Sequence, residues 1–198
     1  MAINKRKLLQ SAQKHLQKGA LDKALNDYQA LLEADRRDTN VRLKVGDLHL
    51  RRGEAGQAIE AYLRVAAQFM KDGFDAKAVA IYKQVTKIEA TRQEVWEPLA
   101  ELYQRMGLTA EAMTALQTAA DTHHQAGRRR EALELLRRMA TLDPTNTVSR
   151  LKVAELLRAE GLDGEALVEY REAAAELERQ GDWEGAAAAL AKALDLEP

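Results

Sequence analysis

Cysteine is absent from this chain of 198 residues, and proline and aromatic residues are scarce. Without cysteine the chain can form no disulfide framework, no thiol nucleophile and no thiolate-bound metal site. Three prolines and 5% aromatic residues, beside 31% charged residues, disfavour a β-sheet protein and suit a succession of amphipathic helices. The formal net charge of −1 provides no overall field that would attract nucleic acid or an anionic membrane.

Long apolar runs are also missing. No window approaches the roughly 18 apolar residues of a membrane-spanning helix. The basic N-terminus, MAINKRKLLQ, lacks the apolar segment of a signal peptide. We therefore expect a soluble, cytoplasmic protein.

What the chain does contain is a repeat. Seven glycines at regular intervals, each followed five residues later by an alanine, mark it: Gly19, Gly53, Gly73, Gly107, Gly127, Gly161 and Gly181. A long and a short interval alternate between successive glycines, as from Gly19 to Gly53 and from Gly53 to Gly73, so the pattern recurs strictly every 54 positions. The segments NVRLKVGDLHLRRG, EVWEPLAELYQRMG and VSRLKVAELLRAEG, which begin at residues 40, 94 and 148, align without insertion. Residues 54 or 108 positions apart are called equivalent below.

Each 54-residue repeat is predicted to contain three helices, because apolar residues recur at helical spacing and glycine suits the left-handed backbone that closes a helix. The first helices are expected at 39–52, 93–106 and 147–160, the second at 56–72, 110–126 and 164–180, and the third at 76–89, 130–142 and 184–196. A partial repeat adds helices at 3–18 and 22–34, for eleven in total. We expect one solenoid over 1–198, with repeats of about 1–38 (partial), 39–92, 93–146 and 147–198.

Two prolines bear on the helix boundaries. Pro144, in the segment DPTN, cannot continue the preceding helix, and Thr145 or Asn146 is available to cap the next one. Pro98 lies inside a predicted first helix, where it removes one backbone hydrogen bond and biases Glu97 away from helical geometry. We expect a late start or a bend in that helix.

These features resemble the tetratricopeptide repeat (TPR), a helix–turn–helix unit of about 34 residues. The best copy consists of Trp96, Leu99, Ala100, Tyr103, Gly107, Ala112, Leu116 and Ala119, with Leu116 in the place of an aromatic residue. Residues 5–38 and 147–180 give further copies, so the resemblance covers essentially the whole chain. It implies an all-α, right-handed α-solenoid of about eleven antiparallel helices that presents a groove to a partner protein.

The short interval, from Gly53 to Gly73 in the first full repeat, departs from the family pattern. It predicts that one helix, about 56–72, closes one hairpin and opens the next. Such a helix needs apolar residues on two faces and small residues where backbones approach, and both are present: Ile59, Tyr62, Val65, Ala66 and Phe69, with Ala58, Ala61, Ala66 and Ala67. Because the order of turns differs from that of a standard repeat, the sequence leaves open which helices line the concave face.

No catalytic arrangement can be assembled from the sequence. The sequence contains no Walker motif and no His-Glu-x2-His motif. Ser11 and Ser149 are the only serines, and no serine–histidine–acid set can be proposed from them. The four histidines, which have no metal-ligand spacing, are His15, His49, His123 and His124. His15 and His123 are equivalent to Phe69 and Leu177, which favours packing between helices. We expect no enzymatic activity, no metal, no cofactor and no small-molecule substrate.

A column of acidic residues is the first candidate for partner binding. Asp47, Glu101 and Glu155 are equivalent positions on the first helices, a column that commonly faces the groove in TPR proteins. Together with the nearby Arg51, Arg105 and Arg158 they could receive a basic or amide-rich segment. The alternative, which we favour, is that Asp47 pairs with Arg51 and Glu101 with Arg105 on a solvated helix face.

A basic stretch is the second candidate. The segment GRRREALELLRRM places five arginines around one third helix, namely Arg128, Arg129, Arg130, Arg137 and Arg138. Aromatic residues do not alternate with them, which disfavours nucleic-acid binding and favours a solvated face.

The two ends of the chain differ in charge. Residues 1–38 carry a net charge of +3 and residues 155–198 a net charge of −8, which allows head-to-tail association into a homo-oligomer. Leu190, Leu194 and Leu196 leave an apolar face after which no capping helix follows, so we expect a part of a longer array.

The function expected from the resemblance is a non-catalytic interaction module, or scaffold, that binds a protein or peptide segment. The composition, rich in alanine and arginine, points to a bacterium, where such arrays serve signalling, motility or envelope assemblies. The alternative function is structural self-assembly through oppositely charged, uncapped ends.

Overall fold

The computed structural model describes residues 5–196, and it is all-α over that range, with eleven α-helices and one short 3₁₀ helix. The chain divides into two compact units, Met1–Val95 and Trp96–Pro198. They are called the N-terminal and the C-terminal unit, and each is described by itself.

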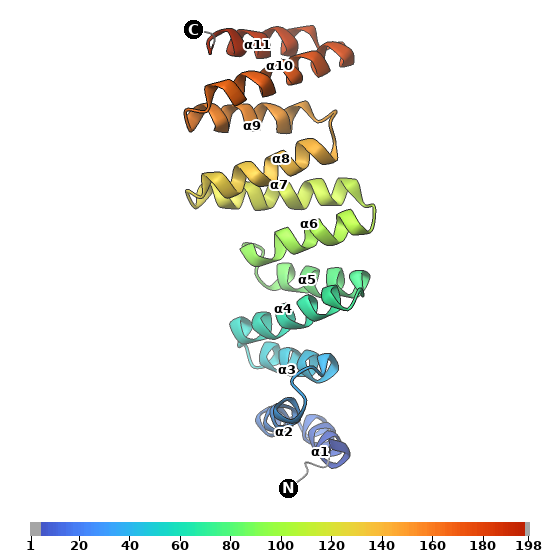
Figure 1. The fold of residues 1–198 in the computed structure, drawn as a ribbon. Coiled ribbons are helices and arrows are strands. Elements are labelled where there is room, and N and C mark those ends of the chain that lie inside the picture. Colours follow the sequence, from blue (N-terminus) through green and yellow to red (C-terminus); the bar gives the residue numbers. More distant parts are fainter. Residues whose placement is uncertain (1–4, 197–198) are drawn as a thin grey trace. The chain divides into compact units, whose positions relative to one another are not determined.

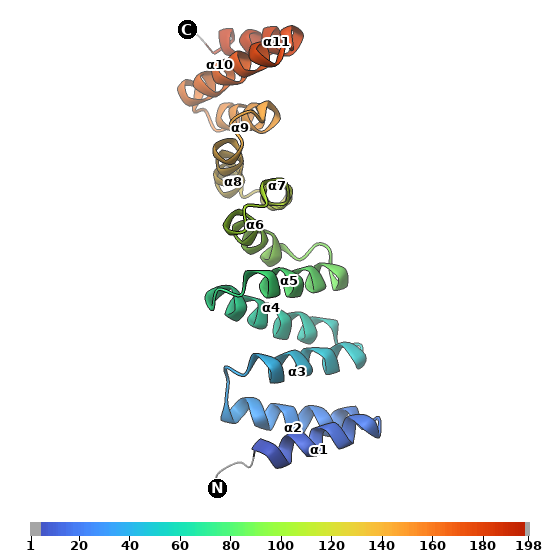
Figure 2. The ribbon, with the colours of Figure 1, turned by 90° about the vertical axis from the view of Figure 1, so that its right-hand side faces the viewer.

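The N-terminal unit contains α1 (Lys5–Gln17), α2 (Leu21–Ala34), α3 (Thr39–Arg51), α4 (Ala55–Lys71) and α5 (Asp75–Ile88), followed by the 3₁₀ helix η1 (Gln93–Val95). Each helix packs against the next one in the chain, so the unit is a stack of antiparallel helices (Figures 1 and 2). Of the predicted helix at 3–18, positions 3 and 4 lie outside the described residues.

The C-terminal unit is a second stack, made of α6 (Trp96–Arg105), α7 (Thr109–Gln125), α8 (Arg129–Leu142), α9 (Thr147–Ala159), α10 (Asp163–Gln180) and α11 (Trp183–Leu194). Figure 1 shows its helices running back and forth from α6 to α11. None of the helices in the described part of the chain is both long and apolar enough to cross a membrane.

The helix α4 explains the short interval between Gly53 and Gly73. It is one continuous helix of 17 residues, flanked by these two glycines. Both glycines have left-handed backbone, with φ of 78° and 77°. After Gly53, the amide of Glu54 donates to the carbonyl of His49, which closes α3 with the bond pattern of a Schellman motif.

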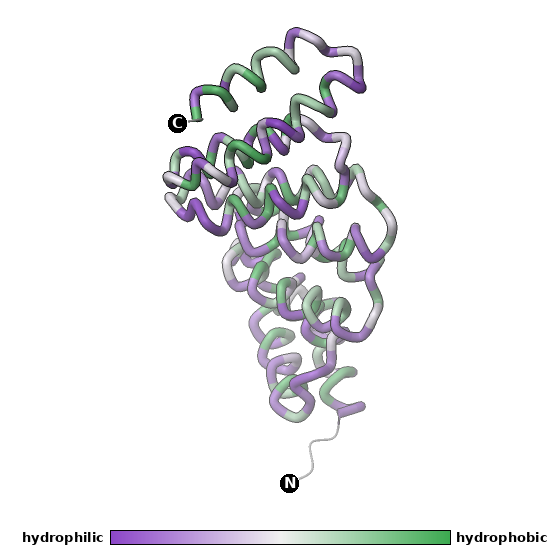
Figure 3. The backbone as a smooth tube through the Cα atoms, turned by 45° about the horizontal axis from the view of Figure 1, so that its top comes forward, coloured by the Kyte–Doolittle hydropathy of each residue, from purple (hydrophilic) through white to green (hydrophobic). Residues whose placement is uncertain are grey.

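The core follows the expectation for a helix between two neighbours. Tyr62 in α4 and its equivalents Leu116 and Tyr170 are all fully buried. Ala58, Ala61 and Ala66 are buried as predicted, whereas Ala67 is exposed, so that part of the prediction was wrong. Hydrophobic and hydrophilic residues are interspersed along the stacked helices (Figure 3). A helix of this pattern buries its apolar residues against its neighbours and leaves its polar face in contact with solvent.

The predicted effect of Pro98 is confirmed. The equivalent helices α3 and α9 begin at Thr39 and Thr147, but here residues Gln93–Val95 form the 3₁₀ helix η1 and α6 begins only at Trp96. Pro98 then lies in the first turn of α6, where the missing amide hydrogen is tolerated. Asn146 caps α9 by accepting a hydrogen bond from the amide of Ser149 at 2.9 Å.

Candidate functional site

The three acidic residues of the predicted column each have a partner within their own unit. Tyr62 Oη donates to Asp47 Oδ1 at 2.8 Å, and Lys44 Nζ lies 3.7 Å from Asp47 Oδ2. Glu101 lies 3.8 Å from Arg105, as predicted for an exposed helix face. The ion-pair partner of Asp47 is therefore Lys44 and not Arg51, so the predicted pair of Asp47 with Arg51 was wrong.

Glu155 is held by a helix further along the chain. Lys192 Nζ, from α11, donates to Glu155 Oε1 at 2.7 Å, and this bond raises the pKa of Lys192. Arg158, the third arginine of this candidate set, lies near Tyr170 and is exposed. Local spacing could not predict the bond between Glu155 and Lys192, since these residues are 37 positions apart.

Tyr62 is a fully buried residue whose hydroxyl lies beside this column. Its pKa is raised, first by burial and then by its hydrogen bond to Asp47 and the charge of that carboxylate. Each of these favours the neutral phenol. The hydroxyl therefore serves as a hydrogen-bond donor that ties α4 to α3.

The five arginines of the predicted basic patch do not form a single surface that could bind one partner. Arg129 pairs with Glu160 at 3.2 Å, Arg137 with Glu165 at 2.5 Å, and Arg138 donates to the side-chain oxygen of Gln104 at 3.3 Å. Arg128 and Arg130 are exposed. The contacts reach different parts of the unit, so α8 spreads its positive charge around its circumference.

The histidines form pairs with carboxylates. His15 lies 2.9 Å from Asp27 on the adjacent helix, and His123 lies 2.9 Å from Glu97 on α6. His49 lies 2.6 Å from Glu54. The placement of His15 and His123 between helices is as predicted, and no group of three metal-ligating side chains occurs among residues 5–196.

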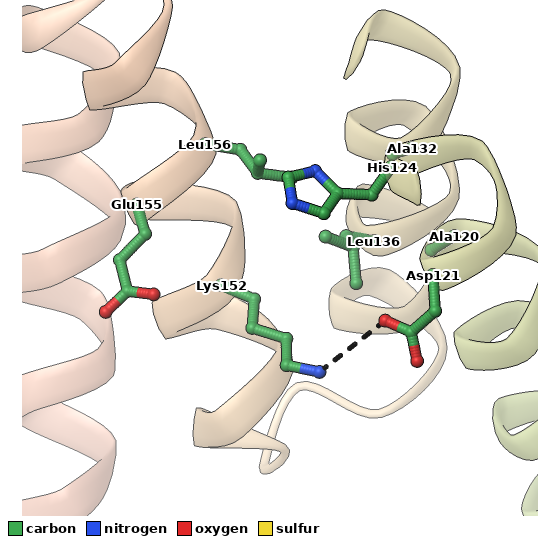
Figure 4. Close-up of a pocket in the computed structure, with 8 residues that line it drawn as sticks. All are labelled: Ala120, Asp121, His124, Ala132, Leu136, Lys152, Glu155 and Leu156. Atoms are coloured by element: carbon green, nitrogen blue, oxygen red, sulfur yellow. Dashed lines mark ion pairs between the residues drawn. The ribbon is translucent and has the colours of Figure 1, made fainter. Parts of the chain in front are cut away.

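The strongest candidate site is a pocket of about 410 Å³ between α7, α8 and α9. Figure 4 shows its lining, which comprises Ala120, Asp121 and His124 from α7, Ala132 and Leu136 from α8, and Lys152, Glu155 and Leu156 from α9. Lys152 Nζ lies 3.9 Å from Asp121 Oδ1 across one side of the pocket (Figure 4). The floor is apolar and the rim carries both signs of charge.

The residue at the floor of this pocket differs in size from residues at equivalent positions of the repeat. The floor residue Leu136 is equivalent to Tyr28 in α2, Tyr82 in α5 and Leu190 in α11; the first three are buried, and Leu190 is exposed. Where α2 and α5 have a phenol ring, α8 has a smaller aliphatic side chain, which fills less of the space between α7 and α9. Sequence analysis did not identify this site, although the equivalent positions carried the signal.

The rim offers hydrogen-bonding groups of both kinds. Lys152 donates, the carboxylates of Asp121 and Glu155 accept, and His124 can do either. This arrangement can bind an apolar side chain in the pocket and hydrogen-bond the polypeptide to which that side chain is attached.

Comparison with known proteins gives similarity of fold only. No family model matches the chain, and no curated protein matches it. Among solved structures, the crystal structure of MamA has a TM-score of 0.32 and 20% identity, covering 86% of this chain and 96% of that one. A tetratricopeptide repeat protein from Parabacteroides merdae has a TM-score of 0.31 and 15% identity, covering 98% and 93%.

A third similar structure is that of pilF from Pseudomonas aeruginosa, with a TM-score of 0.38 and 18% identity, covering 93% of this chain and 88% of that one. At these values nothing about partners or binding residues is transferred to this chain. Its glycine-closed, antiparallel hairpins are themselves TPR-like. The grouping of helices into 54-residue repeats within one array stays a prediction.

Proposed function

We propose that this protein is a non-catalytic interaction module that binds a segment of a partner protein in the pocket between α7, α8 and α9. The observation that carries the proposal is the replacement of a buried tyrosine, as at Tyr28 and Tyr82, by Leu136. The partner supplies the missing ring: an aromatic side chain enters the pocket and lies on Leu136.

The polar rim favours a polypeptide over a small metabolite. Lys152 and Asp121 lie on facing helices, so one can donate to a carbonyl and the other can accept from an amide of an extended segment. The apolar floor supplies the affinity, because burying an aromatic side chain removes roughly 150–250 Å² of surface from water. A segment of mixed or no charge suits the rim better than a purely acidic or basic one.

The cellular setting belongs to the same proposal. An alanine- and arginine-rich array of this kind suits a scaffold in the cytoplasm of a bacterium, within a signalling, motility or envelope assembly. The engagement of Arg129, Arg137 and Arg138 with neighbouring helices disfavours nucleic acid as the partner.

A peptide selection tests the proposal. Random peptides displayed on phage are selected on the full chain, and the survivors are titrated against Leu136→Tyr and against Val168→Tyr as a matched control. Val168 is exposed on α10, so that variant adds the same ring outside the pocket. We expect the selected peptides to share an aromatic residue and to lose affinity only for Leu136→Tyr.

Two results would overturn this proposal. One is a set of peptides that bind Leu136→Tyr as tightly as the unchanged chain. The other is the absence of any shared aromatic residue among peptides that do lose affinity. Circular dichroism on both variants shows whether each is folded, and we expect Leu136→Tyr to fold because tyrosine occupies the equivalent positions in α2 and α5.

Self-association is the second candidate function, favoured by the exposed apolar side chains near the end of the described chain. Trp183 is 70% exposed and Leu194 is 65% exposed, both on α11. Light scattering over a concentration series, at low and at high salt, separates the two functions. A module that only binds peptides stays monomeric, whereas self-association grows with concentration. Association through the oppositely charged ends weakens with salt, and association through the apolar side chains does not.

A further inference from the structure

A second pocket, of about 380 Å³, lies in the N-terminal unit between α2, α3 and α4. Three of its lining side chains are arginines, and the lining comprises Gln29, Leu32, Glu33, Arg36, Arg42 and Arg64. With one glutamate among them, these groups leave the pocket with a net positive charge. Neither the predicted acidic column nor the predicted basic patch contributes to it.

The three arginines, called the arginine cluster below, have no carboxylate within ion-pair distance among residues 5–196. The side chain of Arg42 donates a hydrogen bond of 2.5 Å from Nη2 to the backbone carbonyl of Arg36. Burial lowers the pKa of Arg42, and the positive charge of Arg64 lowers it further. The charge on Arg42 is therefore partly desolvated and faces a like charge, an arrangement that an anion would relieve.

The chain shows what neutralises the equivalent arginine. Arg150 in α9 is equivalent to Arg42, and it forms ion pairs with Glu169 at 3.2 Å and with Glu172 in α10. In α4 the residues equivalent to those two glutamates are Ala61 and Arg64. One position that carries a carboxylate in α10 carries a methyl group in α4, and the other carries a cation. No residue of α4 therefore neutralises the charge of Arg42 in the way that the two glutamates of α10 neutralise that of Arg150.

We propose that the arginine cluster is a second binding site, which receives the carboxylate side chains of an acidic segment in a partner protein. The partner's carboxylates occupy the positions that Glu169 and Glu172 occupy beside Arg150. A guanidinium presents two parallel donors to a carboxylate, so Arg42 and Arg64 can each hold one. This site does not depend on the pocket between α7, α8 and α9.

A neighbouring carboxylate makes the arginine cluster prefer a carboxylate ligand to a ligand with several phosphate groups. Glu33 lines the same pocket and repels a ligand of high negative charge density. The ion pairs of Arg150 show that carboxylates fit the geometry between an α3-type and an α4-type helix.

Fluorescence anisotropy with a labelled hexaglutamate peptide tests the site on the full chain at low salt, with hexaglutamine as the neutral probe. The variant Arg64→Glu copies the arrangement at Glu172, and Arg6→Glu on α1 is the control with the same change of net charge. We expect Arg64→Glu to weaken hexaglutamate binding by about tenfold or more, because it removes a charge-assisted hydrogen bond and adds a like charge. Arg6→Glu should change the affinity by about threefold at most.

The control of folding is built into the variant. Because Arg64→Glu pairs with Arg42 as Glu172 pairs with Arg150, it should be at least as resistant to thermal unfolding as the unchanged chain. Inorganic phosphate is titrated in parallel to separate the two anion chemistries.

Three outcomes would overturn the proposal: equal loss of affinity in the two variants, equal binding of hexaglutamine, or binding of inorganic phosphate at the cluster without binding of hexaglutamate. Leu136→Tyr leaves hexaglutamate binding unchanged, so failure of this site and failure of the proposed peptide pocket are distinguishable.

Discussion

Gly46 of α3 lies against the ring of Tyr62, and replacing it by alanine should destabilise the protein. A methyl group at Gly46 would lie 2.8 Å from Tyr62 Cε1 and 3.1 Å from Cδ1, well inside the optimum of about 3.5–4.0 Å for two carbon atoms. Tyr62 is fully buried and its hydroxyl is bonded to Asp47, so the ring cannot withdraw without breaking that bond.

The magnitude follows from three contributions. Overpacking a buried site costs about 1–3 kcal/mol. Loss of the Tyr62–Asp47 hydrogen bond adds about 1 kcal/mol, a value kept low because the carboxylate is 42% exposed and screened by water. The better helix propensity of alanine returns about 1 kcal/mol. We expect Gly46→Ala to lower the free energy of unfolding by about 1–3 kcal/mol.

Urea unfolding followed by circular dichroism measures this change. Gly56→Ala is the matched control, since a methyl group there meets nothing within 4 Å, and it should be neutral or slightly stabilising. The equivalents of Gly46 and Tyr62 in the next repeat are Ala100 and Leu116, both fully buried, so adding Tyr62→Leu to Gly46→Ala should recover about 1 kcal/mol or more.

Refutation would take either of two forms: Gly46→Ala is as stable as Gly56→Ala, or the two changes at Gly46 and Tyr62 are additive. Tyr170 is accompanied by Ala154 in the third repeat, and both are fully buried, so a tyrosine and an alanine can occupy these two positions together. A loss at the lower end of the expected range, about 1 kcal/mol, would indicate that the ring of Tyr62 moves aside and that only its hydrogen bond to Asp47 is lost.

Two further substitutions test how the helix ends are held. Asp38 caps α3 through a 3.1 Å bond from the amide of Val41; burial opposes its ionisation, but its bonds to Lys5 and Val41 dominate and lower its pKa. Asp38→Ala should therefore cost about 1 kcal/mol at neutral pH. The difference should begin to shrink as the pH falls below about 4, where the carboxylate of the unfolded chain binds a proton, and should be lost once the folded carboxylate is protonated at lower pH; an equal difference in urea at pH 7 and pH 3 would contradict the pairing. Gly73→Ala should lose about 1–2 kcal/mol although open space surrounds it, because its φ of 77° disfavours a side chain, and an unchanged urea midpoint would contradict this.

The positions of the helices were predictable because the repeat marks their ends with glycine. Seven glycines have left-handed backbone in the structure, and all seven belong to the glycine–alanine pattern in the sequence. The late start at Trp96 was predictable for the same kind of reason, since Pro98 acts through local geometry. Signals of this kind need no knowledge of tertiary contacts.

The ion pair between Glu101 and Arg105 was predictable from helical spacing, but the partners of Asp47 and Glu155 were not, because side chains of other helices contribute to them. Asp47 takes Lys44 and Tyr62 in place of Arg51, and Glu155 takes Lys192 from a helix further along the chain. Helical spacing identifies residues that can meet on one helix, and it is silent about which neighbouring helix offers a better partner.

Both proposed sites arise where a repeat differs from some of its equivalents. Leu136 differs from Tyr28 and Tyr82, and Arg64 differs from Glu172. Each difference is visible in the sequence once the repeats are aligned, but its consequence depends on which side chains surround it. The structure supplies those surroundings.

The most direct measurement is methyl NMR of the chain with ¹³C-labelled leucine, titrated with p-cresol, the analogue of a tyrosine side chain. If the pocket between α7, α8 and α9 accepts an aromatic ring, the methyl signals of Leu136 and Leu156 shift and saturate. In Leu136→Tyr the signals of Leu156 then stay unchanged, and in Val168→Tyr they shift as in the unchanged chain. Signals of Leu136 and Leu156 that do not move in the unchanged chain, or signals of Leu156 that still shift in Leu136→Tyr, would contradict a binding site there.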